Sequence, residues 1–144
     1  MIRIATLDDM PELLQFAQNH IAESDWGYHY NEQRAIASFD KYITCDETDV
    51  LLYEGKGHAI VAWDDEFHDE RLGYILKFYV SPEARGKGVS RELMGACNAW
   101  FDHYGCEETI VTDDFGKNGN KIFKNLAAKY NYHPNGEVLI RRVK

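Results

Sequence analysis

The chain has 144 residues, of which 44% are apolar, 13% aromatic and 28% charged. This is enough for one domain with a buried core, and the composition excludes a disordered or collagen-like chain. The 16 Lys and Arg residues stand against 24 Asp and Glu, and the formal net charge of −8 argues against binding to nucleic acid.

The first half of the chain predicts a strand, two helices and a hairpin. Ile2 and Ile4 alternate with polar residues, which predicts a short first strand. Apolar residues then recur at helical spacing in two segments, Leu13, Leu14, Ala17 and Ile21, followed by Ala35, Ile36, Phe39 and Ile43. The aromatic segment 24–30 between them, interrupted by Gly27, predicts a loop or an irregular helix end. Residues 50–53 and 58–63 flank a Gly-Lys-Gly turn and predict a β-hairpin.

The second half predicts a third strand over residues 72–80, which ends before Pro82. A helix of about four turns follows, with Val89, Leu93, Met94, Cys97, Trp100, Phe101 and Tyr104 on its apolar face. Residues 109–111, 118–130 and 138–143 then predict a strand, a helix and a last strand. The order β-α-α-β-β-β-α-β-α-β, without repeat or linker, predicts an α/β fold of the α+β type with one domain over residues 1–144 and a mixed sheet.

The cysteines and histidines define the expected environment. Cys45, Cys97 and Cys106 are odd in number, lack C-x-x-C spacing and follow no signal-like segment, so we expect a reduced, cytoplasmic protein. The longest apolar runs have four or five residues, and a membrane helix needs about 20, so no membrane is expected. The six histidines show no zinc-ligand spacing, and we therefore expect no metal.

Residues 78–94 (FYVSPEARGKGVSRELM) join a strand, a cationic glycine-rich loop and the strongest predicted helix. Backbone amides at a helix start are unpaired and lie at the positive end of the helix dipole. Gly86 and Gly88 would let an anion approach that backbone closely. The spacing fits neither a Walker loop nor a dinucleotide fingerprint. We therefore predict a nucleotide-bearing ligand held by its pyrophosphate, with a solvated helix cap as the alternative.

This segment resembles the GNAT superfamily of acetyl-CoA-dependent N-acetyltransferases. The family signature Q/R-x-x-G-x-G/A stands here as Arg85-Gly86-Lys87-Gly88-Val89-Ser90, with Ser90 in place of the last small residue, and V-x-P-E stands as Val80-Ser81-Pro82-Glu83. The R-x-A-T-x-x-D opening, the element order and Asn120 extend the resemblance over nearly the whole chain. It implies a mostly antiparallel sheet that is splayed at its centre, with helices on both faces.

The resemblance also implies a reaction, namely direct transfer of an acetyl group from acetyl-CoA to a primary amine of a small molecule or protein. It places the coenzyme at Phe78, Tyr79, Val80, Arg85, Gly86, Lys87, Gly88, Val89, Ser90, Asn120 and Phe123. The strand before the loop would part from the strand near residues 109–112. The N–H of Val80 would then polarise the thioester carbonyl. A homodimer is expected only by analogy with relatives.

The acid and base of the family pattern are missing from this sequence. Tyr74 stands where the glutamate base is expected, and Glu70, four residues earlier, shares its strand face if the strand extends that far. Ala127 stands where the tyrosine acid is expected, and Tyr130 lies one turn away. Val80, Glu70 and Tyr130 are therefore the catalytic candidates. A solvated loop and core packing are the alternatives for the last two.

An amine acceptor is cationic, because its pKa is ordinarily near 10.4, and acidic or aromatic walls would suit it. The candidates lie in two segments, Asp25, Trp26, Tyr28 and Tyr30, and Trp63, Asp64, Asp65 and Glu66. Of these, Trp26, Tyr28, Trp63 and Asp64 are the predicted acceptor residues, with core aromatics and solvated acids as the alternative. Two other functions stay open: a coenzyme-binding module without turnover, and an acidic protein that inhibits a basic partner.

Overall fold

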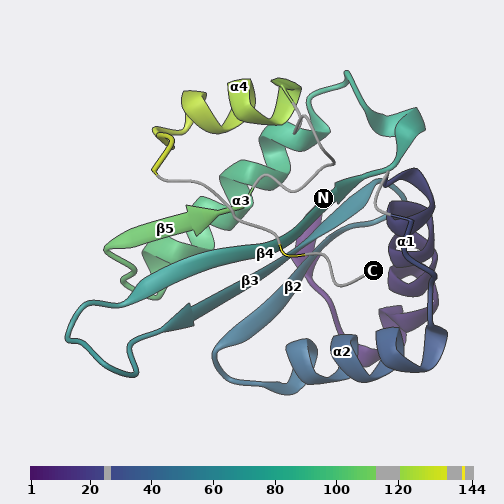
Figure 1. Cartoon of the computed structure of the whole chain (residues 1–144), viewed down its shortest axis with the longest axis horizontal. Helices are drawn as coiled ribbons and strands as arrows, with labels where there is room; N and C mark the ends of the chain where they lie inside the picture. Colours follow the sequence, from purple (N-terminus) through teal and green to yellow (C-terminus); the bar gives the residue numbers. More distant parts are fainter. Residues whose placement is uncertain (25–26, 113–120, 136–140, 142–144) are drawn as a thin grey trace.

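The structure, a computed structural model, describes residues 1–24, 27–112, 121–135 and 141. It is a five-stranded sheet covered by helices on both faces (Figure 1). The elements are β1 (Ile2–Ile4), η1 (Leu7–Asp9), α1 (Met10–Glu23), α2 (Glu32–Thr44), β2 (Thr48–Tyr53), β3 (Gly57–Asp64), β4 (Leu72–Val80), η2 (Pro82–Ala84), α3 (Val89–His103), β5 (Glu108–Val111) and α4 (Lys121–Lys129), where η marks a short 3₁₀ turn.

The predicted α+β fold with a mixed, mostly antiparallel sheet is confirmed. The strand order is β1-β2-β3-β4-β5, with antiparallel neighbours throughout except for the parallel pair β4 and β5. The strand predicted over residues 72–80 and the helix predicted from Val89 occur as expected. The last predicted strand, 138–143, and the first residues of the helix predicted over 118–130 lie outside the described residues. None of the described helices is long and apolar enough to cross a membrane.

The two faces of the sheet bury separate cores, because successive strand residues point to opposite sides. Phe78 and Val80 of β4 pack with Leu93 and Phe101 of α3 on one face. Tyr79, between them, packs on the other face with side chains from α1 and α2, chiefly Leu13, Phe16 and Phe39. The end of β4 therefore contributes to both cores and lies between the two helical layers.

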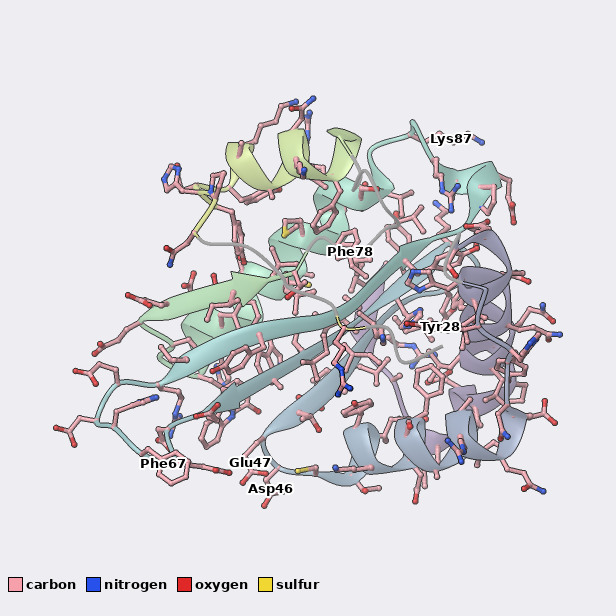
Figure 2. All side chains as sticks on the ribbon, in the orientation of Figure 1. Tyr28, Asp46, Glu47, Phe67, Phe78 and Lys87 are labelled. Atoms are coloured by element: carbon pink, nitrogen blue, oxygen red, sulfur yellow. The ribbon has the colours of Figure 1, made fainter. Side chains whose placement is uncertain are left out.

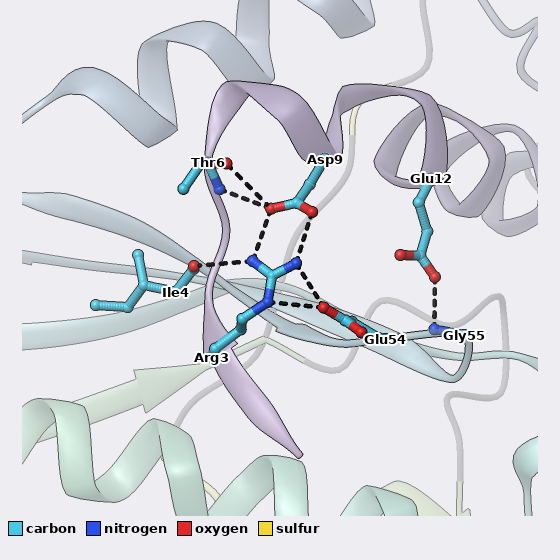
Figure 3. A network of polar contacts seen from close by, with 7 residues as sticks. All are labelled: Arg3, Ile4, Thr6, Asp9, Glu12, Glu54 and Gly55. Carbon is cyan, nitrogen blue, oxygen red and sulfur yellow. Dashed lines mark hydrogen bonds and ion pairs between the residues drawn. The ribbon is translucent and has the colours of Figure 1, made fainter.

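A polar network around Arg3 explains the opening sequence pattern (Figure 3). The guanidinium of Arg3 donates to both carboxylate oxygens of Asp9, at 2.8 and 2.7 Å, and to Glu54 at 2.8 Å. The Asp9 carboxylate also accepts from the backbone N–H of Thr6 at 2.8 Å. Its bonds to Arg3 and Thr6 lower the pKa of Asp9 to about 2. The network ties β1 to the entry of α1 and to the hairpin end of β2.

Candidate functional site

The central feature of the site is a strand that is paired fully on one side and only partly on the other. β4 pairs with β3 from Leu72 to Val80, but its pairing with β5 ends at Ile75 and Val111. Leu76 is an extra residue at a register shift, because Ile60 lies opposite Lys77 and Val61 opposite Ile75. Such a bulge bends its strand. In the described part of the sheet, β4 and β5 are therefore unpaired beyond Ile75.

The alternation of backbone groups shows which of them face this opening. The N–H of Ser81 donates to the carbonyl of Lys56, at the hairpin end next to β3, at 2.8 Å. Ser81 and Tyr79 therefore direct their backbone groups toward β3, and Phe78 and Val80 direct theirs to the opposite side. A Cβ on Gly57 would collide with the carbonyl oxygen of Tyr79, so a glycine allows this close approach of β3. The Val80 N–H faces the open side.

The loop after β4 presents backbone with no side chain in front of it. Gly86 and Gly88 have φ values of 76° and 83°, which favour glycine, and a Cβ on either would meet nothing within 4 Å. Gly88 is the N-cap of the 15-residue helix α3, and Val89 is buried beneath it. Lys87 lies at the rim of the molecule (Figure 2). Open amides at the start of a helix fit the diphosphate group that the sequence predicts.

Arg85 is tied to its neighbours at the start of this loop. Its Nε donates to the carbonyl of Val80 at 2.9 Å, and its Nη2 pairs with Glu23 of α1 at 2.6 Å. Glu23 also accepts from the hydroxyl of Tyr79 at 3.2 Å. Burial, with Glu23 adding to the effect, raises the pKa of Tyr79 to about 12, so this hydroxyl stays protonated at neutral pH. The pairs fix the loop to α1 and to the end of β4.

A cavity of about 640 Å³ lies against the open side of β4. Its lining combines two groups of side chains. From the α3 and α4 side come Ile75, Phe78, Val111, Thr112 and Phe123, and from the α1 and α2 side come Ala17, His20, Ile21, Ser24, Tyr28, His29, Tyr30, Asn31, Arg34, Ala35, Ser38, Phe39, Tyr42, His58, Ile60 and Lys77, with Leu76 of the bulge. The cavity therefore connects both layers past the unpaired part of β4. Tyr28 and Phe78, one from each group, are labelled in Figure 2.

His58 lines this cavity and is not among the site residues predicted from the sequence. Its side chain is buried between Phe16 and Phe39, with ring centroids 5.7 Å away in both cases. Burial, with smaller effects from His20 and Lys77, lowers its pKa to about 3, so the ring is neutral at neutral pH. Its Nδ1 has no hydrogen-bond partner among the described residues. In the sequence, His58 was only a strand residue beside a turn.

The buried neutral ring predicts a loss of stability in acid. Below the ordinary pKa of 6.5, the unfolded chain binds a proton that the folded protein does not bind until about pH 3. The free energy of unfolding therefore falls as the pH falls between these values, by up to about 1.4 kcal/mol per pH unit from this group. Urea unfolding across this range should show a shallower fall in His58→Gln than in the wild type. The exposed-site control His133→Gln should match the wild type, and an equal slope in His58→Gln would contradict the assignment.

The structure does not bring Glu70 to Val80. Glu70 is an exposed residue of the connection between β3 and β4, and β4 begins only at Leu72. Nine strand residues at about 3.3 Å each separate the two ends by roughly 30 Å. Phe67 of the same connection lies at the far end of the molecule from Lys87 (Figure 2). The strand does not extend to Glu70, which was the condition for placing it on the face of Tyr74.

Of the other predicted site residues, some line the cavity and others do not. The hydroxyl of Tyr130 donates to the carbonyl of Arg91 on α3 at 2.9 Å and does not line the cavity. Trp63 lies under the guanidinium of Arg71, 3.7 Å from the ring centroid, and neither Trp63 nor Asp64 lines the cavity. Tyr28 and Phe123 do line it. Asp25, Trp26 and Asn120 lie outside the described residues.

The site combines an open strand, a glycine turn at a helix start and a cavity between the two helical layers. The model of the acetyltransferase (GNAT) family matches residues 12–128, and the chain belongs to this family. An uncharacterized N-acetyltransferase from Archaeoglobus fulgidus is 27% identical over 101 residues, which cover 65% of this chain and 67% of that protein. The expected family membership is confirmed.

Two solved structures have the same fold at low sequence identity. A predicted acetyltransferase from Clostridium acetobutylicum, solved with acetyl-CoA, has a TM-score of 0.74 and 16% identity, covering 99% of this chain and 96% of its own. The aminoglycoside N-acetyltransferase AAC(6')-Iy, in complex with CoA, has a TM-score of 0.77 and 16% identity, covering 99% and 93%. These two structures show that the fold is shared. The ligands in them are properties of those two proteins.

Proposed function

We propose that this chain transfers the acetyl group of acetyl-CoA to an amine held in the cavity. The observation that carries the proposal is the cavity that passes the open side of β4 at residues 75–78; Val80 is not among its lining residues, and its N–H faces the same side of the strand two residues further on. The glycine turn at residues 86–88 follows the same strand end. Related folds solved with acetyl-CoA and with CoA support this choice of donor.

The coenzyme would be held by the residues that the signature selects. The amides of residues 86–90 would bind the diphosphate, since the start of α3 adds partial positive charge there. Phe78 and Val80 would supply backbone groups to the pantetheine arm, whereas Tyr79, which was predicted with them, directs its backbone groups to β3. Phe123, whose ring centroid is 5.2 Å from that of Phe78, would pack beside it. Arg85, Lys87, Val89, Ser90 and Asn120 complete the proposed set.

The chain's own groups would act on the reaction in two ways. The Val80 N–H would donate to the acyl oxygen, where negative charge develops as the amine attacks. The cavity would hold the neutral amine against the carbonyl carbon, so that a C–N bond forms as the C–S bond breaks. The amine proton would pass through water to the leaving thiolate, whose conjugate acid has an ordinary pKa of about 8.5. This route needs no carboxylate, and the described lining contains none.

Thiol release tests the proposal. With acetyl-CoA and a panel of small amines and lysine peptides, at least one amine should release free thiol and form an acetylamide detected by mass. Acetyl-CoA alone should raise the melting temperature, because it binds only the folded state. No stabilisation would contradict coenzyme binding and favour the acidic interaction protein.

A binding module without turnover is the second candidate. It is favoured by the positions of Glu70 and Tyr130, which both lie away from the cavity. Stabilisation by acetyl-CoA together with no thiol release from any amine would favour this candidate over the transferase.

A further inference from the structure

The charges in the cavity lining are not those expected for an amine site. The described lining residues include no Asp or Glu, and Arg34 and Lys77 carry its only permanent charges. Of the predicted acidic residues that the structure describes, Asp64 does not line the cavity and Asp65 pairs with Arg71 at 3.4 Å, while Asp25 lies outside the described residues. In its described part, the acceptor side is therefore positive, although the whole chain carries −8.

The two cations reach the cavity from different elements. Lys77 follows the bulge of β4 and lies opposite Ile60, which packs in the core under α1 and α2. Arg34 lies in the first turn of α2, where its N–H donates to Oδ1 of the N-cap Asn31 at 3.0 Å. The positive end of the α2 dipole therefore adds to the charge of Arg34. Neither cation forms an ion pair with any residue of the described chain.

Two buried polar atoms complete this half of the cavity. The hydroxyl of Tyr30 and Nδ1 of His58 are both buried, and neither has a hydrogen-bond partner among the described residues. Buried polar atoms are ordinarily paired, because leaving one unpaired costs about 1–3 kcal/mol. Both residues line the cavity, but the two unpaired atoms themselves are closed to solvent, so a ligand would have to displace neighbouring side chains to reach them. The remaining walls are largely apolar or aromatic, including Phe39 and Tyr42.

From this lining, and resting on the proposed function, we infer that the acceptor is a small amine that also carries an anionic group, a carboxylate or a phosphate. Arg34 and Lys77 bind that group with charge-assisted hydrogen bonds. A polycationic amine would instead bring like charges together at Arg34 and Lys77, which are both exposed residues. The inferred substrate class therefore differs from an aminoglycoside, the class named for one related fold.

Binding to the CoA-saturated protein tests the inference without any turnover. The probes are 4-(aminomethyl)benzoate, its phosphonate analogue and its neutral carboxamide, which share one skeleton and one amine. At least one of the two anions should bind about tenfold or more tightly than the carboxamide, and the tighter anion identifies the source of the charge. Arg34→Gln and Lys77→Met should each remove most of this preference for the anion, because each removes one of the two cations proposed to bind it. A tenfold change in affinity corresponds to about 1.4 kcal/mol.

Lys41→Met is the matched control, because Lys41 is an exposed residue of α2 outside the lining and its loss changes the net charge equally. It should keep the preference, and all three variants should bind CoA as the wild type does. Equal affinity for the three probes, or a preference that survives in both cavity variants, overturns the inference. A bound anion without thiol release on adding acetyl-CoA supports the anion site and contradicts the transferase instead.

Discussion

Gly88→Glu is expected to weaken acetyl-CoA binding by at least about 100-fold while the chain still folds. The substitution places a carboxylate beside the amides proposed to hold the diphosphate, and repulsion between the two anions opposes binding. At φ 83°, a residue with a Cβ adds about 1–2 kcal/mol of backbone strain, which shifts the loop without unfolding the core. Titration calorimetry measures the affinity, and thermal unfolding measures the fold.

Gly105→Glu is the control for this variant. Gly105 follows α3, has φ 70°, and has nothing within 4 Å of an added Cβ, so the strain and the added charge are similar. It should bind acetyl-CoA with wild-type affinity. Unchanged affinity in Gly88→Glu, or an equal loss in Gly105→Glu, would contradict the assignment of the loop.

Val80→Pro is expected to lower kcat by about 10²–10³-fold, the effect of losing one oxyanion donor. Proline removes the N–H that we propose to bind the acyl oxygen. The ladder with β3 should survive, because alternation directs that N–H away from β3. Proline favours extended backbone at the residue before it, and that residue, Tyr79, lies in strand β4. Steady-state thiol release at saturating amine gives kcat for each variant.

Val80→Ala separates the lost N–H from the lost side chain. Val80 is buried in the core on the α3 face, so both variants lose packing and should unfold at a lower temperature than the wild type. Alanine keeps the N–H and should retain kcat within about tenfold. Similar kcat values in the two variants would show that the backbone donor at this position is not used.

The elements that carry the loop were predictable because their patterns are local. Residues 72–80 are mostly apolar and end before Pro82, and the apolar face from Val89 recurs at helical spacing over 15 residues. Gly86 and Gly88 were predicted to leave the backbone open to an anion, and an added Cβ at either would meet nothing within 4 Å. Each of these signals depends on residues close in the chain.

The positions of the catalytic candidates were harder to predict, because spacing in the sequence does not give the direction of a side chain or its distance from another residue in the fold. Glu70 is only ten positions before Val80, but extended strand turns that interval into roughly 30 Å. Tyr130 lies one turn from the expected position, yet its hydroxyl bonds to Arg91 on another helix. The acceptor residues Trp63 and Asp64 are near the hairpin in sequence and lie away from the cavity in space.

By itself, the sequence determined the family, the α+β class, β4, the glycine loop and the helix that follows it, since short-range patterns encode these. Only the tertiary structure decided which side chains line the cavity together. Arg34 of α2, His58 of β3 and Lys77 of β4 converge there because strand register and helix packing join residues that no local pattern relates. The positive charge of the described cavity lining follows from this packing, and it is opposite in sign to the net charge of the whole chain.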